Sequence, residues 1–104
     1  MARLRWTKPA LRDLDDVAEY IALDNPVAAA RLVKKTFNRV ERLKKFPNSG
    51  RRPPELPRTP YREVIVPPCR VFYQLKRKTI YILYVMRSER LLRPYLLDQK
   101  SKQE

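Results

Sequence analysis

The chain has 104 residues and a mass of 12.5 kDa, which suits one small domain and excludes two. Apolar residues make up 43% of it, enough for one core, whereas 24 Lys and Arg against 11 Asp and Glu leave a net charge of +13 and predict an acidic partner. Because the sequence has no His and one Cys, Cys69, it excludes a His-based proton relay, a zinc site and an intrachain disulfide.

The N-terminal residues predict a short strand followed by a helix. Leu4 and Trp6 alternate with arginines, the period of a half-buried strand. From Pro9 to about Leu23, apolar residues recur at three- and four-residue steps, and Thr7 with Pro9 supplies a helix start signal. The early turns of this amphipathic helix carry three aspartates, whose charge favours the helix dipole: Asp13, Asp15 and Asp16.

A second helix is predicted from Pro26 to about Phe46, capped by Asn25. One side of it is apolar and the other basic, so the two helices should form an antiparallel hairpin. The basic side carries these residues: Arg31, Lys34, Lys35, Arg39, Arg42 and Lys45. Residues 47–50 end the helix, and Gly50, the only glycine, is a candidate for a positive φ.

The second half of the chain predicts a loop and three strands. Residues 51–60 contain four of the ten prolines and indicate an extended basic loop. Three β-rich runs follow, at Tyr61–Val66, Arg70–Leu75 and Thr79–Met86, and the gaps between them suit hairpins. The last run is apolar on both faces, so we expect a central strand covered on both sides.

These elements predict one α+β domain over residues 1–97. Its order is strand, two helices and three strands (βααβββ), with the helical hairpin on one face of a mainly antiparallel four-stranded sheet. Residues 91–97 are expected to form a short helix or strand, and residues 98–104 to fray as a tail. Nothing near Met1 resembles a secretory signal and no run is long enough to span a membrane, so we expect a cytoplasmic protein that binds no membrane.

Four motifs accompany this element order: PNSGR at 47–51, YREVIVP at 61–67, CRVFY at 69–73 and IYILYV at 80–85. With them the chain resembles the RelE/ParE superfamily of bacterial type II toxins over nearly its whole length. The resemblance implies a toxin that is neutralised by a cognate antitoxin. No cofactor, metal or small-molecule substrate is expected.

The superfamily has two branches with different targets. RelE-like members cut mRNA on the ribosome, whereas ParE-like members inhibit DNA gyrase and hydrolyse nothing. For the nuclease, the resemblance implies a site made of Arg62, Arg70, Arg87 and Tyr95, although Val64 stands where a second-strand cation is expected. The REVIVP sequence is closer to the ParE-like plasmid-stabilisation toxins, although Arg87 replaces their frequent His. We therefore predict a gyrase inhibitor, with the mRNA nuclease as the alternative.

Two groups of basic residues are candidate binding sites. The target surface is expected near one edge of the sheet, where these residues would form a cationic patch: Arg62, Arg70, Arg87, Arg90 and Tyr95. The alternative for its arginines is ordinary pairing with Glu63 or Glu89, worth under about 1 kcal/mol each. An acidic antitoxin is expected on the basic side of the second helix, at these residues: Arg31, Lys35, Arg39 and Arg42.

Two simpler alternatives stay open. The basic helix side is otherwise a solvated face, although like charges four residues apart destabilise a helix by about 0.2–0.5 kcal/mol per pair, which favours a binding surface. A net charge of +13 also fits a non-specific nucleic-acid-binding module, although the glycine-rich and aromatic signatures of common RNA modules are missing. Cys69 is interpreted as an inert turn residue.

Overall fold

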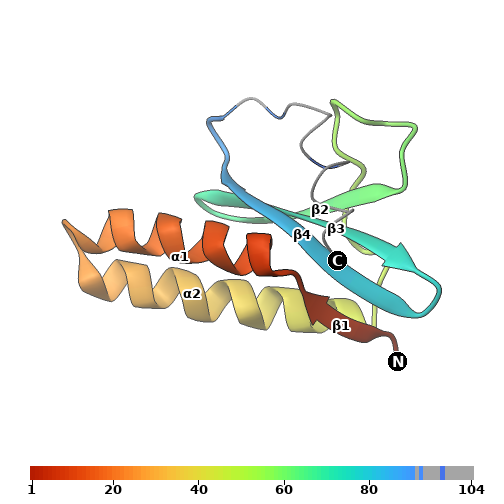
Figure 1. Ribbon diagram of the computed structural model, residues 1–104, viewed down its shortest axis with the longest axis horizontal. Helices are drawn as coiled ribbons and strands as arrows, with labels where there is room; N and C mark the ends of the chain where they lie inside the picture. The colour runs from red at the N-terminus through yellow and green to blue at the C-terminus, as the bar shows by residue number, and fades with distance from the viewer. Residues whose placement is uncertain (91, 93–96, 98–104) are drawn as a thin grey trace.

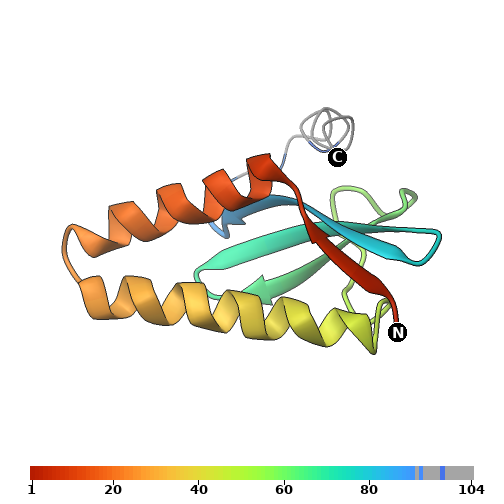
Figure 2. The ribbon, with the colours of Figure 1, turned by 60° about the horizontal axis from the view of Figure 1, so that its bottom comes forward.

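The computed structural model describes residues 1–90, 92 and 97, which form two helices packed on one four-stranded sheet (Figure 1). The elements are β1 (Arg3–Trp6), α1 (Lys8–Ala22), α2 (Pro26–Glu41), the 3₁₀ turn η1 (Arg42–Lys44), β2 (Tyr61–Val66), β3 (Cys69–Lys76) and β4 (Thr79–Arg87). The strand order is β1-β4-β3-β2, with antiparallel hairpins and β1 parallel to β4. The helices lie antiparallel across one face (Figure 2), which confirms the predicted α+β class.

Both helices start at the predicted caps. The Thr7 hydroxyl accepts a hydrogen bond from the Ala10 N–H at 3.3 Å, and the Asn25 side chain accepts one from the Ala28 N–H at 3.0 Å. The second helix ends earlier than expected, at Glu41, and tightens into η1. Leu43 is fully buried, so the apolar side of the helix continues into η1. Pro47 then disfavours helical geometry at Phe46, the residue before it.

The sheet has an apolar cluster on each face. The helix-side cluster contains Val64, Val66, Cys69, Val71, Tyr73, Ile80, Ile82 and Val85 from the sheet, packed on Ala10, Leu14, Leu32, Val40 and Leu43. The opposite cluster contains Tyr61, Phe72, Leu83 and Met86, covered by Leu56, Leu92 and Leu97. Strand β4 contributes to both, lies between β1 and β3 and is covered on both faces, as predicted. No helix within the described ranges is long and apolar enough to cross a membrane.

The proline-rich loop is folded rather than extended as predicted. The Leu56 N–H donates to the Pro53 carbonyl at 2.9 Å, and the Thr59 hydroxyl donates to the Leu56 carbonyl at 3.0 Å. Proline favours such turns as much as an extended chain, so the proline content of residues 51–60 could not distinguish a folded loop from an extended one. The turns bury Leu56 against the sheet and bring the loop over its outer face.

Gly50 is required by close packing, and the predicted positive φ is wrong. A Cβ at this position would lie 2.6 Å from the Tyr73 ring and hydroxyl and 2.7 Å from the Glu63 carbonyl oxygen. The buried Tyr73 hydroxyl accepts a hydrogen bond from the Gly50 N–H at 2.9 Å and donates one to the Pro47 carbonyl at 2.8 Å. The PNSG segment therefore closes on Tyr73, and only glycine leaves room for the contact.

Replacing Gly50 by Ala should lower the free energy of unfolding by about 1–3 kcal/mol, because the added methyl group overlaps a buried ring and a backbone carbonyl that cannot both move. Urea denaturation measures the loss. Ser49→Ala, at an exposed neighbour, is the control and should stay within about 0.5 kcal/mol of the wild type. Equal stability of the two variants would show that Tyr73 yields without cost.

Candidate functional site

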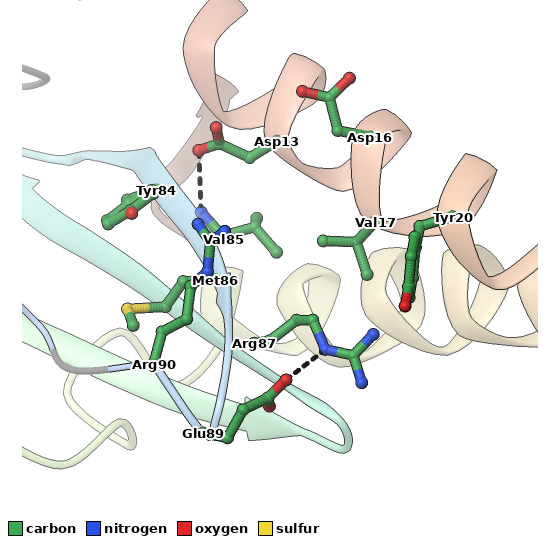
Figure 3. A pocket seen from close by; sticks show the side chains of 10 residues that line it. All are labelled: Asp13, Asp16, Val17, Tyr20, Tyr84, Val85, Met86, Arg87, Glu89 and Arg90. Carbon is green, nitrogen blue, oxygen red and sulfur yellow. Dashed lines mark hydrogen bonds and ion pairs between the residues drawn. The ribbon is translucent and has the colours of Figure 1, made fainter.

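A groove of about 510 Å³ runs between α1 and the end of β4. Figure 3 shows the side chains that line it, which come from α1, the end of β4 and the turn after β4: Asp13, Asp16, Val17, Tyr20, Tyr84, Val85, Met86, Arg87, Glu89 and Arg90. Two of the predicted target-binding residues, Arg87 and Arg90, are among them. The groove is therefore the candidate site of this chain.

Asp13 joins the two walls of the groove. Strand β1 pairs with β4 only as far as Ile82, and the backbone groups of Val85 face away from β3 because its β3 partner, Val71, bonds to β2. Past the end of β1, the Val85 N–H donates to the Asp13 carboxylate at 3.2 Å, as Figure 3 shows. The sequence interpretation gave Asp13 a helix-dipole role and missed this contact, which no local pattern signals.

Arg87 is held in place by its neighbours in the groove. Its guanidinium carbon lies 5.6 Å from the centre of the Tyr20 ring, and its Nε donates to Glu89 at 2.6 Å. Tyr20 is 67% exposed, so an aromatic ring and a cation lie together at the surface. Arg90 is exposed nearby, its N–H bonded to the Arg87 carbonyl at 3.0 Å.

The charge of the groove is mixed. Three carboxylates, those of Asp13, Asp16 and Glu89, share it with the two arginines. A purely cationic patch, as the sequence suggested, would attract any polyanion, whereas this mixture repels a bare phosphate chain and favours a partner surface that carries both signs.

Arg70 lies elsewhere, clamped by two carboxylates on the outer face of the sheet. Its Nε donates to Glu63 at 2.7 Å and its Nη2 at 3.0 Å, while Nη1 and Nη2 each donate to Glu55 at 2.9 Å. These bonds raise the pKa of Arg70, those from Glu55 having the larger effect, and they hold the pKa of Glu55 below its usual value. Arg70 is 7% exposed and Glu63 only 1%.

Arg62 supports a loop. Its Nη1 donates to the Gly50 carbonyl at 2.8 Å and to the Asn48 carbonyl at 3.3 Å. Side chains alternate along β2, so Arg62 shares a face with Val64, on the helix side of the sheet, whereas Glu63 faces the opposite side with Arg70. The structure therefore places Arg87 and Arg90 in one groove and Arg62 and Arg70 apart from them; Tyr95 lies outside the described residues.

The basic side of α2 divides between two surfaces. Lys35, Arg39 and Arg42 line a groove of about 320 Å³ beside the end of β2. Arg31 lines a separate one with Pro26, Val27, Ala30 and Lys34. The four predicted antitoxin-binding residues thus lie along α2 and the start of η1, and three of them face the sheet edge.

The thiol of Cys69 is not placed to act as a nucleophile. Cys69 is fully buried at the start of β3, and burial raises the pKa of its thiol above the ordinary value, which keeps it protonated. Within residues 1–90, 92 and 97, no group of three or more His, Cys, Asp or Glu side chains is arranged to hold a metal ion.

Known proteins resemble the chain in sequence and in fold. The sequence model of the ParE toxin of the type II toxin-antitoxin system parDE matches residues 4–92. Toxin RelE2 of Caulobacter vibrioides is 32% identical over 92 residues, which cover 88% of this chain and 100% of that protein. Putative toxin Y4kP of Sinorhizobium fredii is 49% identical over 49 residues, 47% of this chain and only 51% of that protein.

A solved structure supports the same relationship. A chain described as the chromosomal ParDE TA system from P. aeruginosa superimposes with a TM-score of 0.71 at 32% identity, covering 86% of this chain and 98% of that one. The match therefore extends over most of both chains.

Proposed function

Because the chain belongs to the ParE toxin family of type II toxin-antitoxin systems, we propose that it inhibits DNA gyrase in the cytoplasm and so blocks replication, as plasmid-stabilisation toxins of this kind do. Membership implies an antitoxin partner. The proposed action is binding to the enzyme, without hydrolysis of any substrate by the toxin itself.

The observation that favours gyrase over mRNA as the target is that Arg70 is already bonded to two carboxylates. RelE-like nucleases need free cations around the scissile phosphate, and Arg70 occupies the third-strand position that would supply one. Here four of its donor contacts go to Glu55 and Glu63, so a phosphate would have to displace a carboxylate first. Val64, 2% exposed, fills the position of a second cation with an apolar core residue.

The α1–β4 groove supports a protein target. Tyr and Arg are enriched among the residues that dominate binding energy at protein interfaces, and Tyr20 with Arg87 supplies both in one exposed contact. The neighbouring carboxylates would repel a nucleic-acid backbone but pair with Lys or Arg of a protein. We assign gyrase contact to this groove, through Arg87 and Arg90.

One observation favours a second candidate. The 32% identity to Toxin RelE2 extends over that protein's full length, which keeps a ribosome-dependent mRNA endonuclease as the alternative. The resemblance implies Arg62, Arg70, Arg87 and Tyr95 as the catalytic set for that activity, but Arg62 and Arg70 lie on opposite faces of the sheet, and Glu55 would have to leave Arg70 when mRNA binds.

A paired assay tests the proposal. Purified toxin should inhibit the supercoiling of relaxed plasmid by gyrase, or trap cleaved plasmid, at near-stoichiometric concentration, and adding the antitoxin should restore supercoiling. The same toxin should leave mRNA intact in a ribosome-containing translation reaction. Cut mRNA with normal supercoiling would establish the nuclease, and plasmid binding with neither effect would establish a non-specific nucleic-acid-binding module.

A further inference from the structure

Strand β2 forms one margin of the sheet (Figures 1 and 2), and an isolated bridge to Arg51 covers only part of its outer edge. Arg51 bonds to Glu63 there in both directions, with N–H to carbonyl distances of 3.0 and 2.8 Å. The outward backbone groups of an antiparallel edge recur every second residue, so those of Ile65 point the same way. Among the described residues, no backbone group bonds to the outward N–H or carbonyl of Ile65.

A basic groove lies directly beside this open position. Its lining includes Lys35, Arg39 and Arg42 on one side and Ile65 on the other, and it contains no carboxylate. Positions 35, 39 and 42 are spaced by four and three residues, so they form one stripe along α2 that faces the end of β2. The Ile65 side chain, 41% exposed, alternates with Val64 and Val66 and so points to the face opposite the helices, which leaves its backbone as the part beside the three cations.

We propose that this edge binds an extended acidic segment of the antitoxin as an added β-strand. The segment would pair with the Ile65 backbone, continue the ladder that Arg51 begins, and place carboxylates on Lys35, Arg39 and Arg42. This inference rests on the antitoxin partner of the proposed function and adds where, and in which conformation, that partner binds.

The open backbone edge favours a polypeptide over a nucleic acid. Ile65 offers a donor and an acceptor side by side, and a β-strand supplies the matching acceptor and donor. A phosphodiester chain supplies acceptors only, so it would satisfy the cations and leave the Ile65 carbonyl without a donor. A strand added at this edge would satisfy both the N–H and the carbonyl of Ile65.

Backbone hydrogen exchange tests the strand without any substitution. In the complex of wild-type toxin and its antitoxin, the Ile65 amide should exchange at least tenfold more slowly than in the free toxin when followed by NMR. The Val64 amide, which faces β3, is an internal reference because it is protected in both states. An Ile65 amide that exchanges equally fast in the complex would overturn the proposal and leave the antitoxin partnership intact.

Charge reversal tests the basic stripe against a matched control. Lys35, Arg39 and Arg42 are changed together to Glu, and Arg3, Lys8 and Lys78, which are exposed and do not line the groove, are changed to Glu in the control. The two variants have the same net charge. The stripe variant should bind the antitoxin at least tenfold more weakly than the control and with a shallower salt dependence.

The remaining outcomes are decisive too. Equal affinities of the two variants would place the antitoxin elsewhere, and weakened binding of duplex DNA by the stripe variant, with no Ile65 protection by the antitoxin, would make the groove a nucleic-acid site. If wild-type toxin and antitoxin form no complex at all, the partnership itself fails. Gyrase inhibition by free toxin is measured separately and depends on none of these results.

Discussion

Replacing Arg70 by Ala is expected to lower the free energy of unfolding by about 3–5 kcal/mol. The change leaves the carboxylate of Glu63 buried, its side chain fully inaccessible, with Arg51 as its remaining cation at 3.2 Å. Arg51 is 59% exposed and makes one contact where Arg70 makes two, so it compensates only in part. Urea denaturation at neutral pH measures the loss.

Two variants separate the buried charge from other causes. Glu55→Gln keeps the shape of the clamp and removes a partly exposed charge, so it should cost only about 1 kcal/mol. Replacing Glu63 and Arg70 together by Leu and Met removes both buried charges and should recover most of the stability. A loss below about 1 kcal/mol for Arg70→Ala alone would mean that Glu63 does not depend on Arg70.

Replacing Arg87 and Arg90 together by Ala is expected to weaken gyrase inhibition by roughly 10²-fold with little loss of stability. Arg87 supplies a preoriented cation on the Tyr20 ring, and both arginines are accessible in the α1–β4 groove. Their contribution to folding is small because the Arg87–Glu89 pair is largely solvated, with side chains 33% and 61% exposed. Supercoiling inhibition and the melting temperature are measured on the same preparation.

The matched control replaces Arg3 and Lys45, two exposed cations at the other end of the molecule, by Ala. It removes the same charge and should inhibit gyrase as the wild type does. Undiminished inhibition by the Arg87/Arg90 variant would assign the target surface elsewhere. A drop of its melting temperature by more than about 5 °C would show that these arginines support the fold.

Local periodicity explains how much of the fold was predictable. Thr7 and Asn25 cap the two helices as their sequence context indicated, and the apolar run of β4 identified the central strand. The parallel pairing of β1 with β4 has no such signal, because it joins segments separated by most of the chain and depends on how the helical hairpin returns to the sheet.

The candidate site was less predictable, for different reasons at different residues. A two-residue turn at 67–68 sets the register that places Arg62 and Arg70 on opposite faces, so their separation is implicit in the strand alternation. The position of Glu55 could not be predicted from the sequence, because a turn-rich loop has no periodicity that would place a carboxylate beside Arg70. The Asp13 contact depends on where β1 ends along β4, because α1 then passes the open edge of β4 at Val85.

The pairing of β1 with β4 also fixes when the newly made chain can complete its fold. Thr7 donates to the Ile82 carbonyl across 75 positions of sequence, and every residue of β1 pairs with a partner in β4. At translation rates of about 5–20 residues per second, Thr7 is synthesised about 4–15 s before Ile82. Strand β1 therefore has no strand to pair with during this interval. The groove between α1 and β4 cannot form on a nascent chain until β4 has emerged.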